Sequence, residues 1–423
     1  MSYYTSQIST KMIDPNVFVV NQRCEFQLPK NDYGNRMRLE NVGLFGAGTP
    51  TYNSYIGALA SIKSIRLLNG RDELDACREC NRHLSFKRFA KSSQKNISYN
   101  QPAYKHDYAP VFSGNGTGAN AANAIRKIQK SMDLGGDANR QIQATESATP
   151  KAYLLLSEVL PFLKSVEVLP AELFSQLRVV IEYESDVRNL CSASNATLST
   201  TRPLLSCDVI EDKELVSMMS KELNGATWDC VEHDLVRIPA NNADATNVLV
   251  SRRLNGFNNK RLMRFYVSKA PSDKRENVVQ GTTNVRSGGD FISQALLNEK
   301  FQVRINGSNK ISRDGADKPT QRLSMLVDAY GECSTYYGSS RHGAAQQGDF
   351  TGIEFDSGRN DYYGMYLNDV VKDMEIQITR DTFQTNAAVG FAKPQASGYD
   401  VHIFGDVRKA LMVNGNQYQV LYA

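Results

Sequence analysis

Tryptophan, long apolar runs and a leader-like N-terminus are scarce or missing in this chain. Tryptophan occurs once in 423 residues, whereas tyrosine occurs 20 times and phenylalanine 17 times. The longest apolar runs, Val17–Val20 and Tyr153–Leu156, fall far short of the about 20 residues that a membrane-spanning helix needs. The segment Met1–Asn16 has neither a basic nor an apolar stretch, so we expect no secretory signal. The abundant tyrosine and phenylalanine favour half-buried positions on β-sheets.

Recognised catalytic motifs are absent as well. The sequence has no Walker phosphate loop, no G-x-S-x-G elbow and no H-E-x-x-H helix. The run Gly114–Gly118 (GNGTG) resembles a phosphate loop but lacks the lysine that should follow, so we interpret it as a flexible loop. We therefore assign no catalytic residue, no cofactor-binding residue and no cofactor, and we predict that the protein is not an enzyme.

The seven cysteines form no recognisable framework. Their odd number and scattered positions argue against disulfides and favour a reducing compartment of synthesis. Cys77-x-x-Cys80, with His83 behind it, has the spacing of half a zinc site, but no second pair with similar spacing occurs. We interpret both cysteines as small apolar residues on the buried face of a helix, and we predict no metal site.

The five histidines are far apart in the sequence. Only His233 has a suggestive neighbour, Asp234, and in a strand two adjacent side chains point to opposite faces of the sheet. We therefore interpret His233 as an ordinary surface histidine.

Charge is nearly balanced, with a formal net charge of +4 at pH 7, which argues against strong nucleic-acid binding over the whole surface. Two local clusters of basic residues stand out. They are Arg82, Lys87, Arg88, Lys91 and Lys95, and Arg252, Arg253, Lys260, Arg261 and Arg264. We prefer to interpret them as solvated faces balanced by nearby acids. The alternative is a surface turned toward packaged nucleic acid or an anionic membrane.

A pattern in the first half of the chain returns in the second half. Ile65–Gly70 is an apolar strand that ends in Asn-Gly, and Val303–Gly307 repeats it. Leu177–Tyr183 (LRVVIEY) and Met374–Thr379 (MEIQIT) form a second matching pair. The length also exceeds what one hydrophobic core usually serves. We predict two β-rich domains of one kind in tandem, over residues 1–200 and 201–423, because small polar residues replace the strand pattern near Ser192–Cys207.

Alternation of apolar and polar residues predicts the individual strands. The apolar positions of these patterns are Cys24, Phe26 and Leu28, Met37 and Leu39, and Met374, Ile376 and Ile378. Val401–Phe404 and Tyr418–Tyr422 are further strands, with a turn at Asn414–Asn416. Long irregular connections between the strands favour antiparallel sandwiches over βαβ units.

Helices are expected in four places, and long polar loops in three. The predicted helices are Asp72–Lys91, Glu211–Leu223 (capped by Asp208 or another nearby Asp), Asp290–Lys300 and Pro319–Ala329. The predicted loops are Ser113–Pro150, Lys269–Asp290 and Ser308–Lys318. A loop as long as the first is uncommon in a compact domain and usually has a purpose in function or packing.

The order of several segments carries a resemblance over nearly the whole chain. These segments are Ser61–Gly70, Leu160–Phe162 with Leu169–Pro170, Trp228 with Arg237–Pro239, Phe301–Gly307 (FQVRING), and the terminal VHIFGDVRKALMV and YQVLY. In this order the chain resembles the double-jelly-roll major capsid proteins of tailless icosahedral double-stranded DNA viruses, of the polinton-like virus and virophage type.

The resemblance implies an all-β dominated fold of two tandem antiparallel jelly-roll β-sandwiches, each eight-stranded, with a few short helices in the connections. The chain would be the structural subunit of an icosahedral shell that encloses double-stranded DNA, and three copies would form a pseudo-hexameric capsomer. The implied partners are the chain itself as a homotrimer, neighbouring capsomers, penton and minor capsid proteins, and an inner membrane or genomic DNA on the inner face. The implied location is the virion, after synthesis in the host cytoplasm or nucleus.

The resemblance also gives the loops a role. Ser113–Pro150, Lys269–Asp290 and Ser334–Asp349 would form an outer turret and a clasp between subunits. Met1–Asn16 would be an arm that reaches under a neighbour.

Two other functions remain open. A carbohydrate- or receptor-binding β-sandwich protein of a virion would place aromatic residues on exposed loops, and Tyr336-Tyr337 and Tyr362-Tyr363 are candidates. A glycan-cleaving enzyme would need two carboxylates about 5–9.5 Å apart in a groove.

Overall fold

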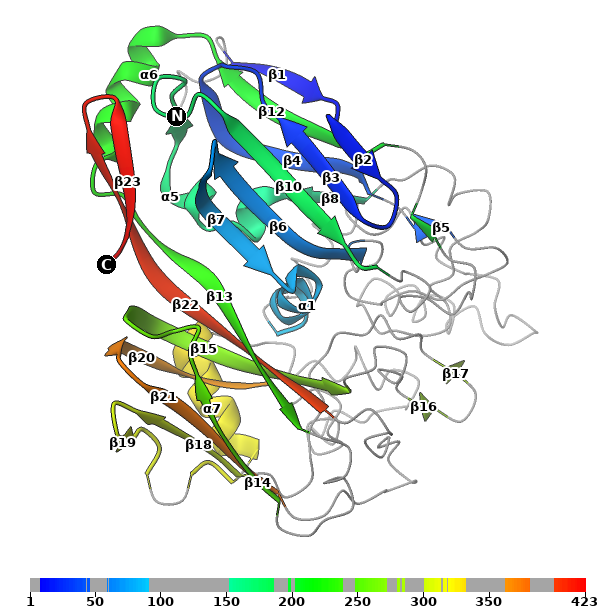
Figure 1. The fold of residues 1–423 in the computed structure, drawn as a ribbon, viewed down its shortest axis with the longest axis vertical. Coiled ribbons are helices and arrows are strands. Elements are labelled where there is room, and N and C mark those ends of the chain that lie inside the picture. The colour runs from blue at the N-terminus through cyan, green and yellow to red at the C-terminus, as the bar shows by residue number, and fades with distance from the viewer. Residues whose placement is uncertain are drawn as a thin grey trace, which may run out of the picture.

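A computed structural model provides the fold. It describes residues 8–42, 44–45, 59, 61–90, 152–185, 197–198, 202–238, 248–271, 280–281, 284–285, 300–312, 315–317, 319–331, 362–380 and 399–423. Within these ranges the chain forms two β-sandwiches, one above the other in Figure 1, with helix α1 (Cys80–Ala90) between them.

The first sandwich consists of two antiparallel sheets. One sheet has the order β1-β12-β4-β8, with β9 paired to β4, and the other has the order β2-β3-β10-β6-β7. The bounds are β1 Ile8–Ile13, β2 Val17–Val19, β3 Arg23–Gln27, β4 Tyr33–Val42, β6 Ile62–Asn69, β7 Asp72–Arg78, β8 Ala152–Leu155, β9 Val168–Leu169, β10 Leu177–Tyr183 and β12 Leu204–Ile210. A separate pair joins β5 (Leu44–Phe45) to β11 (Thr197–Leu198).

The second sandwich repeats this design. Its sheets have the orders β13-β22-β15-β20, with β23 paired to β22, and β14-β21-β18-β19. The bounds are β13 Thr227–Ile238, β14 Val248–Leu254, β15 Lys260–Pro271, β18 Lys300–Ile305, β19 Ser308–Asn309, β20 Tyr363–Val371, β21 Met374–Arg380, β22 Tyr399–Asn414 and β23 Gln417–Tyr422. A short pair joins β16 (Gln280–Gly281) to β17 (Asn284–Val285).

The strand order is the same in both sandwiches. Eight strands of each are counted in chain order: β1, β3, β4, β6, β7, β8, β10 and β12 in the first, and β13, β14, β15, β18, β19, β20, β21 and β22 in the second. When the eight strands of each sandwich are numbered 1 to 8 in this order, one sheet has the strand order 1-8-3-6 and the other has the order 2-7-4-5, in both sandwiches. Two four-stranded sheets interleaved in this way form a jelly roll. The predicted fold class, two tandem jelly rolls, is confirmed.

The repeated sequence pattern marks equivalent strands. β6 and β18 are fourth in their rolls, and β10 and β21 are seventh, so each matching pair occupies one position of the repeat. The two turns after β6 and β18 also match, because Gly70 has φ +60°, and Asn306 and Gly307 have φ values of 52° and 81°. Such left-handed conformations favour Gly and Asn, which explains Gly70, Asn306 and Gly307.

The predicted alternation is confirmed by burial. The eight apolar side chains named above for these patterns are all buried, whereas Arg23, Gln27, Arg36 and Arg38 are exposed. Each of these strands therefore presents one face to the core and one to solvent.

Two of the predicted helices are confirmed. α6 (Lys213–Ser220) continues as a 3₁₀ turn, η4 (Lys221–Leu223), and the Asp212 carboxylate accepts hydrogen bonds from the backbone N–H groups of Glu214 and Leu215. This is the predicted N-cap by a nearby Asp. α7 (Pro319–Tyr330) matches the fourth predicted helix. Two further short elements are η2 (Leu156–Glu158) and α5 (Phe162–Ser165). The predicted helix Asp290–Lys300 lies outside the described residues except for Lys300, which begins β18.

The first predicted helix was wrong over its first half. Asp72–Arg78 is strand β7, paired with β6, and the helix begins only at Cys80. The tight turn at Gly70 folds the chain back onto β6, so ladder hydrogen bonds to β6 decide the conformation of a segment whose charge pattern suggested a helix.

Two segments differ from the expected organisation at the ends of the first roll. Residues 8–13 of the predicted N-terminal arm form β1, which pairs with β12 along its whole length. Leu204–Ile210, predicted to lie in the second domain, is that partner strand β12 and also pairs with β4. We therefore propose that the first roll extends to Ile210 and that α6 and η4 connect the rolls.

Several predicted loops fall where the structure gives no description. Ser113–Pro150 and Ser334–Asp349 lie wholly outside the described residues, and Lys269–Asp290 lies mostly outside them. Among the described residues, no helix is both long enough and apolar enough to cross a bilayer.

Candidate functional site at the junction of the two rolls

The two rolls share a hydrophobic core. Buried residues of both rolls belong to a continuous cluster. Phe162 of α5 contacts Trp228 of β13 edge to face, with ring centroids 4.9 Å apart. Phe86 of α1 stacks on Tyr266 of β15 at 3.7 Å and 16°. Aromatic contacts of this kind hold the two sandwiches in a fixed relation.

Helix α1 carries a polar contact into the second roll. The Nδ1 atom of His83 lies 2.9 Å from the Tyr266 hydroxyl, and both side chains are buried. Tyr266 in turn stacks on Phe404 of β22, with ring centroids 4.9 Å apart. Burial and the nearby ammonium groups of Lys87 and Lys164 lower the pKa of His83 well below its ordinary value, so the ring is neutral at pH 7.

The C-terminal hairpin forms a second connection. In Figure 1 the red hairpin of β22 and β23 extends from the lower roll along the upper one. The Tyr418 hydroxyl accepts from Asn69 Nδ2 at 3.0 Å and donates to Asp72 Oδ2 at 3.2 Å, both at the β6–β7 turn of the first roll. Its ring packs on Phe174 at 5.2 Å.

A buried carboxyl group, Asp75 of β7, lies within this junction. It accepts hydrogen bonds from the backbone N–H groups of Phe162 (2.8 Å) and Ala76 (2.9 Å). Burial raises its pKa to about 7, against the opposing effects of the Phe162 hydrogen bond and of Lys409 from the second roll. The junction thus contains a group that titrates near neutral pH.

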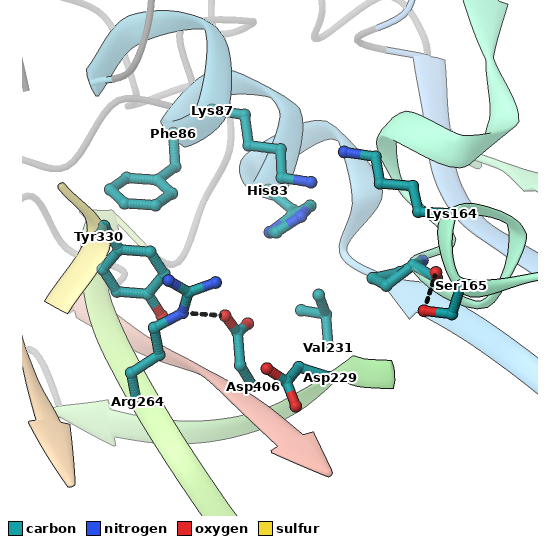
Figure 2. Close-up of a pocket in the computed structure, with 11 residues that line it drawn as sticks. His83, Phe86, Lys87, Lys164, Ser165, Asp229, Val231, Arg264, Tyr330 and Asp406 are labelled. Carbon is teal, nitrogen blue, oxygen red and sulfur yellow. Dashed lines mark hydrogen bonds and ion pairs between the residues drawn. The ribbon is translucent and has the colours of Figure 1, made fainter. Parts of the chain in front are cut away.

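A pocket of about 260 Å³ opens at the junction (Figure 2). Its first-roll wall contains His83 and Lys87 of α1 and Lys164 of α5. The opposite wall, from the second roll, contains Asp229, Arg264 and Asp406 of β13, β15 and β22. Because six separate elements build this pocket, no local sequence motif could have revealed it.

The acidic groups of the pocket have arginine partners. Arg264 Nε lies 2.5 Å from Asp406 Oδ2, and Arg408 contacts Asp229 through Nε (2.8 Å) and Nη2 (3.1 Å). Burial raises the pKa of Asp406, and Arg264 opposes that effect. Arg264 also lies over the Tyr330 ring, at 4.6 Å from its centroid.

The histidines are closer together than the sequence suggested. His233 Nε2 lies 2.9 Å from His402 Nδ1, and the His233 ring is 4.9 Å from that of Phe404. Burial, with Arg82 nearby, lowers the pKa of His233 to about 4. The interpretation as an ordinary surface histidine was wrong, because strand pairing of β13 with β22 sets His233 beside a residue distant in sequence.

The cysteine motif lies in the core. Cys77 and Cys80 are both fully buried, Cys77 on β7 and Cys80 at the first turn of α1. Among the described residues no cluster of three or more His, Cys, Asp or Glu side chains could hold a metal ion. Core packing is the role that this burial supports.

The basic clusters are only partly solvated faces. Arg82 is 2% exposed and lies 3.7 Å from Glu79, which contradicts the prediction for that residue. Lys87 is half-buried and donates to the Glu158 carbonyl oxygen. In the second cluster Arg252, Arg253 and Arg261 are exposed, as expected for a solvated face. Lys91 and Lys95 lie outside the described residues.

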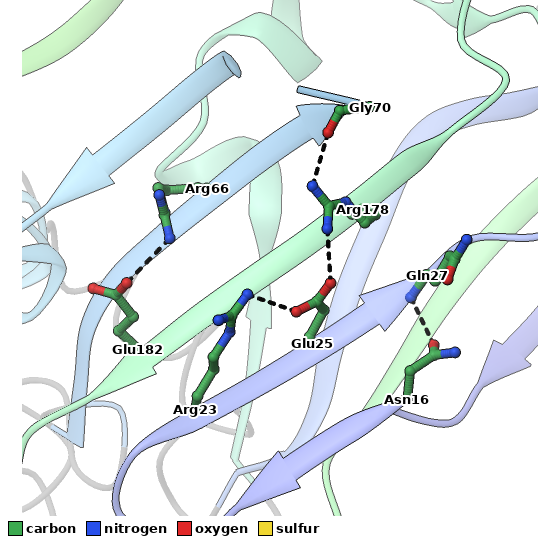
Figure 3. A network of polar contacts seen from close by, with 8 residues as sticks. All are labelled: Asn16, Arg23, Glu25, Gln27, Arg66, Gly70, Arg178 and Glu182. Atoms are coloured by element: carbon green, nitrogen blue, oxygen red, sulfur yellow. Dashed lines mark hydrogen bonds and ion pairs between the residues drawn. The ribbon is translucent and has the colours of Figure 1, made fainter. Parts of the chain in front are cut away.

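The outer faces of two equivalent sheets carry ion pairs. In the first roll Arg178 joins Glu25 Oε1 (3.1 Å) to the Gly70 carbonyl oxygen (2.7 Å), and Arg66 pairs with Glu182 at 3.1 Å (Figure 3). In the second roll the pairs are Arg304 with Glu375 (3.7 Å) and Arg253 with Asp373 (3.3 Å). Exposed pairs contribute at most about 1 kcal/mol each, so these polar faces indicate surfaces in contact with water or polar partners.

The aromatic pair Tyr362-Tyr363 is buried. Phe301 packs on Tyr363 with ring centroids 4.4 Å apart. These two tyrosines therefore offer no exposed surface for a glycan, whereas Tyr336 and Tyr337 lie outside the described residues.

Comparisons with known proteins identify the fold. No model of a protein family matches the sequence, and a search of curated proteins finds no match. Among solved structures, VP54 of the virus PBCV-1, fitted into a reconstruction of the virophage Sputnik, superposes with a TM-score of 0.61 at 10% identity, over 100% of this chain and 99% of that one.

Two further structures are similar to this chain. The Sputnik virophage structure gives a TM-score of 0.56 at 10% identity, over 99% of this chain and 88% of that chain. The Faustovirus major capsid protein gives 0.53 at 9% identity, over 98% and 92%. With two jelly rolls of identical strand order in tandem, this chain has the double-jelly-roll fold of viral major capsid proteins.

Proposed function

We propose that the chain is the major capsid protein of an icosahedral virus and works as a structural building block. The observation that carries this proposal is the duplicated jelly roll locked through a shared core. Three such chains around a three-fold axis present six nearly equivalent rolls. A closed cyclic arrangement satisfies every subunit interface without open-ended growth, which suits a capsomer.

The proposed assembly is a homotrimer that contacts neighbouring capsomers in the shell of the virion. Penton and minor capsid proteins, and an inner membrane or genomic DNA on the inner face, belong to the same proposal. Obligate interfaces typically bury roughly 2,000–5,000 Å². The shared core between the rolls supports the proposal, because a flexible pair of sandwiches would not hold a constant lattice geometry.

One candidate for a subunit contact is the outer side of β20. Among the strands that the structure describes, β20 is at the edge of its sheet, and Tyr366 and Val370 are 52% and 56% exposed. Exposed apolar edge strands invite pairing with another chain, and native proteins usually cover them. We infer that a second copy of the chain covers this edge in the trimer.

The test combines negative-stain electron microscopy with light scattering on the purified chain. We expect hexagonal particles with the mass of three chains. A monodisperse monomer at all protein and salt concentrations would contradict the capsid role and would direct attention to glycan screening.

A variant pair tests the contact itself. Val370→Asp should shift the mass from trimer toward monomer, because it places a charge in an apolar interface. Met218→Asp is the matched control, since Met218 of α6 is 61% exposed on another element, and this variant should remain trimeric. If both variants stay trimeric, β20 is not the contact.

A further inference from the structure

The first-roll wall of the junction pocket contains a buried donor without an acceptor. His83 is 2% exposed, and its Nε2 atom has no hydrogen-bond partner among the described residues. Its Nδ1 atom lies 2.9 Å from the Tyr266 hydroxyl. A neutral imidazole ring has one nitrogen that donates a hydrogen bond and one that accepts. We assign the tautomer in which Nδ1 accepts a hydrogen bond from the Tyr266 hydroxyl. The hydrogen of the neutral ring is then on Nε2, at the pocket.

Two ammonium groups flank this ring. In Figure 2 the side chains of Lys87 and Lys164 both extend toward His83. Lys164 is exposed and has no hydrogen-bond or ion-pair partner among the residues that the structure describes. Burial and the repulsion from Lys164 lower the pKa of Lys87, although the Glu158 carboxylate acts in the opposite direction. Two like charges at one partly buried wall favour an anion between them.

The opposite wall does not cancel this charge. Asp406 is paired with Arg264 and Asp229 with Arg408, so each carboxylate has its own cation. The charged groups that line the pocket are Lys87, Lys164, Arg264, Asp229 and Asp406, which sum to +1. Behind this lining, Arg408 adds a positive charge next to Asp229 and Glu158 adds a negative charge near Lys87, so the sum is unchanged. The pocket therefore has an excess of positive charge on the side of α1 and α5.

We propose that this pocket binds a small oxyanion of the phosphate class, held by Lys87, Lys164 and the Nε2–H group of His83. Three converging donors, two of them charged, suit a tetrahedral anion with several acceptor oxygens. Since one water occupies about 30 Å³ of liquid, the pocket volume of about 260 Å³ accommodates phosphate with ordered waters, or a phosphate monoester. The bound anion would lie between the two rolls and stabilise their junction. This binding does not depend on the capsid role.

Thermal unfolding of the purified full-length chain tests the proposal. Inorganic phosphate should raise the melting temperature in a saturable way, whereas sodium chloride at the same ionic strength should not. Lys164→Gln should raise the apparent Kd for phosphate about tenfold, because it removes a charge-assisted hydrogen bond. Lys221→Gln, which changes an exposed lysine of η4 outside the pocket, should bind phosphate like the wild type.

Line broadening of the ³¹P resonance of phosphate provides a second measurement that does not depend on folding stability. It should be present for the wild type and Lys221→Gln and reduced for Lys164→Gln. Equal effects of phosphate on Lys164→Gln and the wild type would overturn the proposal, as would the absence of saturation. Acetate that binds as tightly as phosphate would overturn the assignment to the phosphate class.

Discussion

His233 lies in an environment that changes its titration. Its pKa is about 4 in the folded protein, against an ordinary 6.5, because burial disfavours the charged ring and Arg82 lies nearby. As the pH falls below 6.5 the unfolded chain binds this proton first, so the free energy of unfolding decreases until about pH 4 and is then constant. Above pH 6.5 the group has no effect.

We therefore predict that the stability of the wild type, relative to that of His233→Gln, falls as the pH is lowered from 6.5 to 4. The expected change in this difference is at most about 3.5 kcal/mol, since the two pKa values differ by about 2.5 and one pKa unit corresponds to about 1.4 kcal/mol. Urea unfolding of both proteins at several pH values measures it. Parallel stability curves for wild type and variant over this range would show that His233 does not titrate as inferred. Asp75, with its pKa raised to about 7, acts in the opposite direction and is common to both proteins.

At the scale of single elements, close packing of strands β15 and β20 sets a strict limit. A Cβ atom at Gly364 would lie 2.2 Å from the Phe265 carbonyl oxygen and 2.9 Å from Tyr266 Cα. Both are backbone atoms of the paired strand, so no change of side-chain rotamer can relieve the clash. At Gly34 of β4 the nearest atom to an added Cβ is 3.6 Å away, an ordinary contact.

Gly364→Ala should lower the stability by about 3 kcal/mol or more, or prevent folding, because overpacking forces the two strands apart. Gly34→Ala should stay within about 1 kcal/mol of the wild type. Chemical unfolding of the two variants compares them. Similar stabilities would mean that strands β15 and β20 can move apart at a lower cost in free energy than their geometry indicates.

The C-terminal hairpin permits a second test at this scale. Tyr418→Phe removes the hydroxyl that joins β23 to Asn69 and Asp72 of the first roll, and should cost about 1–2 kcal/mol. Gln419→Ala truncates an exposed side chain of the same strand, β23, and should change the stability by less than about 0.5 kcal/mol. Thermal unfolding distinguishes the two. Equal effects would indicate that the contact of Tyr418 with the first roll contributes nothing.

At the scale of the whole molecule, the shared core predicts that both rolls unfold together. Phe162 with Trp228, and Phe86 with Tyr266, join the sandwiches through buried aromatic pairs. Separation of the rolls would expose these rings to water, so we expect one calorimetric transition whose calorimetric and van't Hoff enthalpies agree. Two resolved transitions would instead show that the rolls are independent folding units.

The amino-acid sequence by itself determined the strands and their duplication. Alternation as in Cys24, Phe26 and Leu28 depends only on the period of two along an extended chain, which a sequence displays directly. The Asn-Gly turns after β6 and β18 were likewise visible, because left-handed backbone conformations restrict the residue type. The repeat, and with it the expectation of two β-rich domains in tandem, therefore followed from local rules, whereas the jelly-roll fold was expected only from the family resemblance.

Only the tertiary structure decided which distant segments meet. Pairing with β6 made Asp72–Arg78 a strand, and pairing with β1 and β4 placed Leu204–Ile210 in the first roll. The pocket that joins His83 and Lys164 to Asp406, and the contact of His233 with His402, depend on strands and helices that are far apart in the chain. Local patterns record which face of an element is apolar. They do not record which other element covers that face, because long-range packing alone selects the partner.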